Sequence, residues 1–161
     1  MKRIIVFTLI FSCVVKIDAQ VPTYTFEKGK VFEKYSGFKI TKNNTPEKKM
    51  PTIDITPLFE EDEATKSMDL PFRFGKSIDV DLSLKDGKWM KTDSAEIWSL
   101  KISSPNAYSM NFIFSELYLP HGASLYIFNE DGSMVYGPVT EVQNDHGATF
   151  LTDIIKGASV I

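Results

Sequence analysis

Hydrophobic and polar positions alternate with a period of two through the second half of the chain. In EIWSLKI, residues 96–102, and in AYSMNFIFSEL, residues 107–117, large apolar residues recur at every second position. Successive side chains of a strand point to opposite faces of a sheet, so this alternation predicts half-buried strands. The core side chains that these two runs predict are Trp98, Leu100, Ile102, Tyr108, Met110, Phe112 and Phe114.

Shorter alternating runs predict further strands, and turn residues such as Asp86-Gly87 and Asp131-Gly132 separate them. These runs cover residues 77–84, 87–91, 124–129, 134–137, 148–152 and 157–161. Several short strands with no helical pattern between them predict an all-β fold, an antiparallel β-sandwich, over residues 71–161.

A short helix is predicted in the lead-in segment 51–70. Thr56 is expected to cap its first N–H groups, and Pro57 suits the first helical position. The acids of residues 60–63 follow, where the helix dipole favours negative charge.

Residues 1–19 have the order of a secretory signal peptide. Lys2 and Arg3 precede an apolar run, residues 4–15, which is too short to span a bilayer as a helix. Cleavage is predicted between Ala19 and Gln20, giving a secreted, extracellular protein with no membrane attachment after removal of the signal. A lipoprotein box ending at Cys13 is disfavoured, because two further valines follow it.

Composition narrows the classes of partner. The whole chain has 18 basic and 21 acidic residues, and removal of the signal takes Lys2, Arg3, Lys16 and Asp18, leaving 15 and 20, a net charge of −5. This mild negative charge without a basic block argues against nucleic acid. Cys13, the only cysteine, leaves with the signal, so no disulfide is expected. Residues 20–50 are polar and weakly patterned, and are predicted to be a linker.

Candidate catalytic and metal-binding residues are few. His121 and His146 each lie between turn-forming neighbours, which predicts corners of the sheet and no catalytic role. No GDSGG or G-x-S-x-G motif accompanies them, so no catalytic residue is assigned. Asp79 begins a stretch that fails as a calcium loop, because Leu84 and Met90 occupy the positions of the required Gly and Glu. No metal or cofactor is therefore expected.

Several stretches carry a resemblance to a known family. They are Arg73-Phe74-Gly75, Trp98-Ser99-Leu100-Lys101-Ile102, Ser104-Pro105, Leu119-Pro120-His121-Gly122-Ala123, Tyr126-Ile127-Phe128, Asp131-Gly132 and Gly137-Pro138. The chain resembles the non-catalytic N-terminal pro-region of secreted bacterial lysyl-endopeptidase-like serine proteases of the trypsin type. The resemblance covers roughly residues 50–161, and residues 96–138 are its specific part.

The resemblance implies a parent protein that is a secreted serine endopeptidase. This chain would be its pro-region or accessory domain, assisting the folding of the protease domain of the same parent chain or shielding it. The family's catalytic residues have no counterpart here, so the chain alone is expected to be inactive. The apolar run 158–161 is strand-like, which predicts that the β-domain continues beyond Ile161.

A second function stays open from the residues themselves. The chain would then be a free-standing extracellular β-sandwich that binds protein or carbohydrate. Trp89 is the tryptophan that the alternation leaves available for stacking on a sugar.

Overall fold

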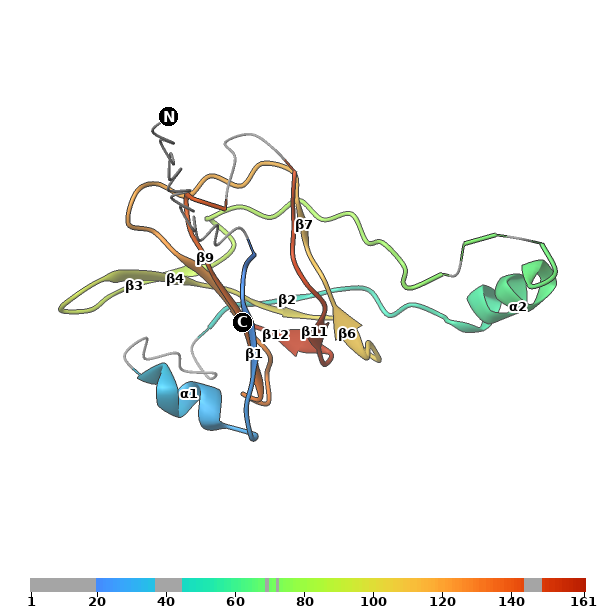
Figure 1. Cartoon of the computed structure of the whole chain (residues 1–161), viewed down its shortest axis with the longest axis horizontal. Coiled ribbons are helices and arrows are strands. Elements are labelled where there is room, and N and C mark those ends of the chain that lie inside the picture. Colours follow the sequence, from blue (N-terminus) through green and yellow to red (C-terminus); the bar gives the residue numbers. More distant parts are fainter. Residues whose placement is uncertain (1–19, 37–44, 69, 72, 144–148) are drawn as a thin grey trace, which may run out of the picture.

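The structure, a computed structural model, describes residues 20–36, 45–68, 70–71, 73–143 and 149–161. Within these ranges the chain forms short strands arranged in small sheets, with two helices (Figure 1). The expectation of an all-β fold is confirmed. Ala19 and His146 lie outside the described residues, and Gln20 is the first residue described.

One three-stranded antiparallel sheet has the order β1-β9-β8. Its strands are β1 (Thr23–Thr25), β9 (Met134–Val139) and β8 (Leu125–Phe128). The turn at residues 129–133 closes the β8–β9 hairpin, as the sequence predicts, and the Gly132 N–H donates to the Asn129 carbonyl at 3.1 Å. Gly132 has φ +66°, a left-handed conformation that favours glycine.

Asp131 fastens this turn. Its Oδ1 accepts hydrogen bonds from the hydroxyl and the backbone N–H of Ser133. The hydroxyl contact is the main cause that lowers the pKa of the Asp131 carboxyl, and the positive charge of Lys28 adds to it. The turn is thus stabilised by an ionised carboxylate.

A second three-stranded sheet has the order β12-β5-β2. Its strands are β12 (Ser159–Val160), β5 (Lys101–Ser103) and β2 (Glu47–Lys49). β12 runs antiparallel to β5, and β2 runs parallel to it. Phe128 and Ile161 exchange both backbone hydrogen bonds at 2.8 Å, which joins the end of β8 to the end of the chain.

Three two-stranded pairs complete the sheets. They are β3 (Lys88–Lys91) with β4 (Glu96–Ser99), β6 (Ser109–Met110) with β11 (Ile155–Lys156), and β7 (Ile113–Phe114) with β10 (Phe150–Leu151). Every predicted strand run from residue 87 onward therefore contains a strand. The run at 77–84 does not, and the structure assigns no strand to it.

The main core lies between these sheets. Ile127, Tyr136, Val139, Ile155 and Val160 are buried together. Of the predicted core residues, Leu100 is buried, Ile102, Met110 and Phe112 are half-buried against this core, and Trp98 and Phe114 are half-buried.

The prediction for Tyr108 is wrong, because its side chain is 90 % exposed. β6 begins only at Ser109, so Tyr108 precedes the strand and its side chain is not held to the face that packs on the core. The Tyr108 carbonyl still accepts a hydrogen bond from the Gly157 N–H at 2.8 Å. Its backbone is paired while its ring points to solvent.

Residues 20–36, predicted to belong to a polar linker, instead form β1 and α1 (Lys30–Lys34) and pack on the first sheet. Val31 is fully buried against Phe128 and Val135, and its N–H donates to the Gly132 carbonyl. The apolar residues here are spaced too widely for a recognisable period, but tertiary contact with the hairpin buries them.

The predicted helix forms as α2 (Thr56–Thr65), with Pro57 in its first turn as expected. The expected cap is wrong, since Thr56 provides no side-chain cap. Asp54 Oδ1 instead accepts a hydrogen bond from the Thr56 N–H at 3.0 Å. Asp54 therefore satisfies the N–H of Thr56 itself, and not the N–H groups two or three residues later that the threonine hydroxyl was expected to satisfy.

Candidate interaction surface

The chain leaves the sheets between residues 51 and 86, a segment we call the arm. Figure 1 shows it running from β2 out to α2 and back toward β3 and β4, away from the sheets. Connections longer than about 12–15 residues are uncommon in compact domains, and those that occur are usually functional loops or linkers. The arm is therefore the first candidate for a functional surface.

Both ends of the arm are attached to the sheets. At its start, Met50 is buried and its N–H donates to the Ser103 carbonyl at 2.7 Å. At its end, the Trp98 indole N–H donates to the Leu84 carbonyl at 2.9 Å. Gly87 lies flat against the Trp98 ring, and a Cβ there would come within 2.3 Å of a ring carbon. Only glycine permits this close approach without displacing the indole.

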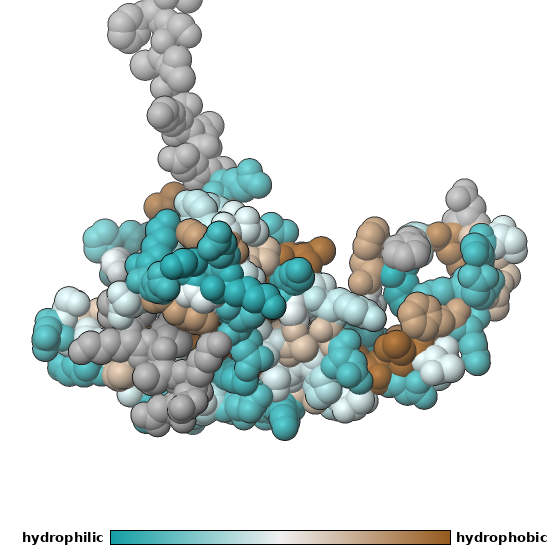
Figure 2. All heavy atoms as spheres, turned by 90° about the horizontal axis from the view of Figure 1, so that it is seen from below, coloured by the Kyte–Doolittle hydropathy of each residue, from teal (hydrophilic) through white to brown (hydrophobic). Residues whose placement is uncertain are grey.

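The outer part of the arm, residues 56–76, is its tip, and it exposes large apolar side chains. The Phe74 side chain is 91 % exposed, and Phe59, Met68 and Leu70 are each more than half exposed. Figure 2 shows apolar residues gathered over this end of the molecule. Scattered exposed apolar residues are ordinary, but a gathering of this kind is typical of interaction sites.

Ion pairs within the arm hold the tip together. The Arg73 guanidinium contacts Glu61 Oε2 at 2.7 Å and Asp62 Oδ1 at 3.0 Å. The hydrogen bond to Glu61 is the main cause that raises the pKa of Arg73. Through these contacts the part of the arm that returns toward β3 is attached to α2 at Arg73.

The negative charge of the protein is concentrated in the arm. Residues 51–86 contain 9 acidic and 4 basic residues, a net charge of −5. This equals the −5 expected for residues 20–161, so the remaining sequence is neutral in sum. The arm combines an apolar tip with a net charge that favours a basic partner surface.

His121 lies at a corner of the chain, as the sequence predicts. The Ala123 N–H donates to the Pro120 carbonyl across the turn. The imidazole is 96 % exposed, and its Nδ1 contacts a carboxylate oxygen of Glu141. The other oxygen of Glu141 accepts the Gly122 N–H at 3.2 Å. In the described part of the chain no serine hydroxyl hydrogen-bonds to His121, so the nucleophile–base contact of a triad is not formed there.

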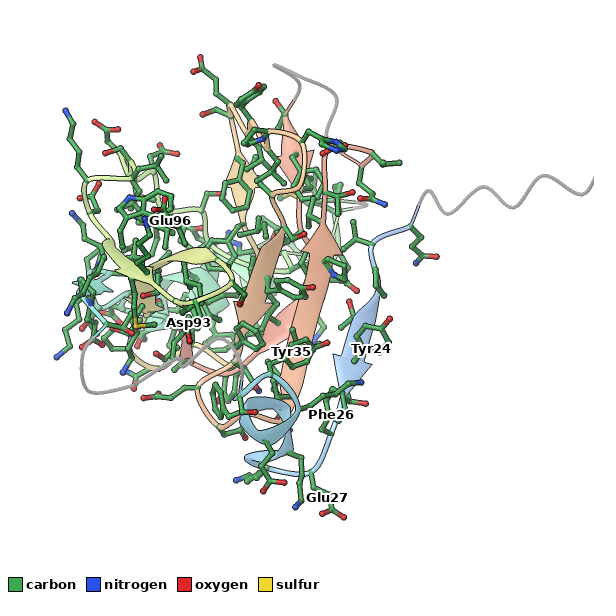
Figure 3. The ribbon with its side chains drawn as sticks, turned by 90° about the vertical axis from the view of Figure 1, so that its left-hand side faces the viewer. Tyr24, Phe26, Glu27, Tyr35, Asp93 and Glu96 are labelled. Atoms are coloured by element: carbon green, nitrogen blue, oxygen red, sulfur yellow. The ribbon has the colours of Figure 1, made fainter. Side chains whose placement is uncertain are left out.

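An aromatic cluster, which sequence reasoning missed, surrounds a lysine. Lys34 Nζ lies 5.0 Å from the ring centre of Phe26, 5.6 Å from that of Tyr24 and 5.9 Å from that of Tyr35. Figure 3 shows these three rings near one another where β1 and α1 meet. Burial is the main cause that raises the pKa of Tyr35, and the neighbouring Tyr126 hydroxyl adds to it. Cation–π contact fastens α1 to β1.

Two shallow hollows occur on the surface of the sheets. One, of about 350 Å³, is bordered by Val21, Tyr136 and Asp153. The other, of about 290 Å³, is bordered by Ser133, whose hydroxyl is engaged with Asp131 and Asn129. Neither hollow includes His121 or an arm residue.

Searches for other kinds of site were made over the same described ranges. They contain no group of three or more His, Cys, Asp or Glu side chains placed to hold a metal ion. Asp79, which begins the stretch that fails as a calcium loop, is exposed on the arm, and so is Asp81. None of the helices in the described ranges is long and apolar enough to cross a membrane.

Comparison with known proteins adds no assignment. No protein-family model matches the chain, and no solved structure matches it. The arm and its tip are thus the candidate surface on the strength of their geometry and charge.

Proposed function

We propose that this chain is the non-catalytic pro-region or accessory β-sandwich of a secreted, trypsin-type serine endopeptidase. It binds the protease domain of the same parent chain and assists its folding or shields it. Two things support this proposal: the resemblance of residues 96–138 to such pro-regions, and the arm. The observation that carries it is the exposed apolar tip, held away from the sheets by attachments at both ends.

Docking of the tip would remove apolar surface from water. Full burial of a side chain the size of Phe74 stabilises a complex by about 1.5–3 kcal/mol, so the four large side chains of the tip supply a substantial driving force. The net negative charge of the arm speeds encounter with a basic surface of the partner. The sheets serve as the rigid base from which the arm extends.

The experiment uses the protease domain encoded after codon 161 of the parent gene. That domain is refolded alone and with the 161-residue chain added in trans, and the yield and peptidase activity are measured. The chain should raise the refolding yield or inhibit the folded enzyme. Phe74→Ser should weaken the effect by about tenfold or more, because it removes the most exposed apolar group of the tip.

Tyr108→Ser is the matched control, since Tyr108 is equally exposed but lies on the sheets. It should leave the effect unchanged. A parent gene without a protease domain, or an effect that Phe74→Ser does not alter, contradicts the proposal. The chain alone should hydrolyse no fluorogenic peptide, and hydrolysis that disappears in His121→Ala would contradict the proposed non-catalytic role.

One observation favours the alternative, a free-standing binding module. Trp89 in β3 is 55 % exposed and lies directly across from Trp98 in the β3–β4 pair. An exposed indole on a sheet is a platform on which a sugar ring can stack. Calorimetric titration with soluble oligosaccharides tests this function, and binding that is lost in Trp89→Ala would favour it over the protease proposal.

A further inference from the structure

The inner part of the arm, residues 77–84, has the sequence of a strand but no strand partner. We call it the stem. Ile78, Val80, Leu82 and Leu84 alternate in it with polar residues. Residues 77–82 make no hydrogen bond within the part of the chain that the structure describes, and Val80 and Leu84 are 48 % and 62 % exposed. The stem therefore presents unpaired backbone N–H and C=O groups along its edges and apolar side chains at every second position.

Among the described strands, the outer edge of β2 has no partner strand. β2 is the outer strand of the β12-β5-β2 sheet. The Pro46 carbonyl accepts the Lys101 N–H, and the Met50 N–H donates to Ser103, so these two positions face β5. Because backbone direction alternates along a strand, Glu47 and Lys49 direct their N–H and C=O groups to the open side.

We propose that the chain forms a two-fold symmetric dimer in which the stem of each copy adds as a strand to the β2 edge of the other copy. Main-chain hydrogen bonds would supply affinity in this mode, and alternate side chains would supply specificity. Each copy contributes one stem and one edge, so the contact is reciprocal and closed. The dimer would cover both the exposed apolar stem and the open edge.

The charges favour this pairing over others. The stem carries Asp79 and Asp81, and the β2 edge carries Glu47, Lys48 and Lys49, all of them exposed. Successive side chains of β2 point to opposite faces, so Glu47 and Lys49 share one face and Lys48 lies alone on the other. The favoured orientation places the two aspartates on the side of Lys48, away from Glu47. Pairing of stem with stem would instead bring aspartates together, which is destabilising. The opposite charges select the second copy's β2 edge as the occupant.

The first test is the mass of the full chain by sedimentation equilibrium over a range of concentrations. The wild-type chain should reach the mass of a dimer, and Asp79→Pro/Val80→Pro should remain a monomer, because N–H groups of successive residues point to opposite edges and the two prolines together remove a donor from the edge that faces β2. Val80→Thr, which keeps a β-branched side chain, is the control and should still dimerise. Both variants should keep the wild-type circular dichroism spectrum, since residues 79 and 80 are exposed and unbonded.

The second test is charge reversal. The double variants Asp79→Lys/Asp81→Lys and Lys48→Glu/Lys49→Glu should each weaken the homodimer by about tenfold or more at low salt. An equimolar mixture of the two should restore a dimer, now heterodimeric.

A wild-type chain that stays monomeric, a dimer that survives Asp79→Pro/Val80→Pro, or a mixture that fails to associate would each overturn the inference. A monomer in which the stem amides are nevertheless protected from hydrogen exchange would mean that the stem pairs within its own copy, which also overturns it. The proposed function is tested separately, because it depends on the tip and not on the stem.

Discussion

Asn129 provides a direct test of how the β8–β9 hairpin is fastened to the rest of the protein. Its side chain is only 2 % exposed and makes four hydrogen bonds. Oδ1 accepts the N–H groups of Ser133 at 3.0 Å and Met134 at 2.8 Å. Nδ2 donates to the Ser133 hydroxyl at 3.0 Å and to the Lys156 carbonyl at 3.3 Å. The last bond joins the hairpin to β11.

The substitution Asn129→Ala removes all four bonds, but the cost is not four times one bond. The Ser133 N–H keeps its bond to Asp131, and the Ser133 hydroxyl donates to Asp131 as well. The Met134 N–H and the Lys156 carbonyl lose the side-chain partner. A buried polar group left unsatisfied costs about 1–3 kcal/mol. Met134 is half-buried and Lys156 is exposed, so water can replace part of what is lost, and the expected loss of stability is about 1–3 kcal/mol in total.

The assay is urea denaturation followed by circular dichroism. Asn129→Ala should lower the midpoint with little change in the slope, which corresponds to a change in stability alone. Asn111→Ala is the matched control, because Asn111 is exposed and its side chain makes no hydrogen bond in the described structure. The control should change the free energy of unfolding by less than about 0.5 kcal/mol. A loss for Asn129→Ala as small as that of the control would refute the assigned network.

Three further outcomes are expected. Val31→Ala should lower the free energy of unfolding by about 2 kcal/mol in the same assay, whereas Val142→Ala should change it little because Val142 is exposed. Equal effects of the two substitutions would mean that α1 does not pack on the sheet. Gly87→Ala should change tryptophan fluorescence and lower the melting temperature because its Cβ collides with the indole, whereas Gly75→Ala, with open space around it, should do neither. The pKa of Asp131 is lowered in the folded state, so its contribution is present at neutral pH and is lost as the pH falls through and below the ordinary value of 3.8. Asp131→Asn should therefore make the midpoint of unfolding less sensitive to acid, and an unchanged pH dependence would contradict this reading.

The period-two pattern by itself determined that the second half of the chain is built of strands, and for much of it which face is apolar. Met110 and Phe112 pack against the core. Ile113, which lies between Phe112 and Phe114 in the sequence, is exposed, as the alternation requires. Turn residues likewise placed the corners at 120–123 and 129–132. These features are local, because the direction of a side chain in a strand depends only on its own position in the chain.

Which strands pair, and which segment has no partner, was decided only by the tertiary structure. The stem has the same alternation as the true strands but no strand partner within the described residues, and Val31 is buried although its surroundings read as polar. The apolar residues of the candidate surface can be read from the sequence, but only the tertiary structure shows that their side chains are exposed. Asn129 bonds Lys156 across 27 residues. Hydrogen-bond partners and burial depend on residues that are far apart in the chain. A local pattern does not specify which of these distant residues come together.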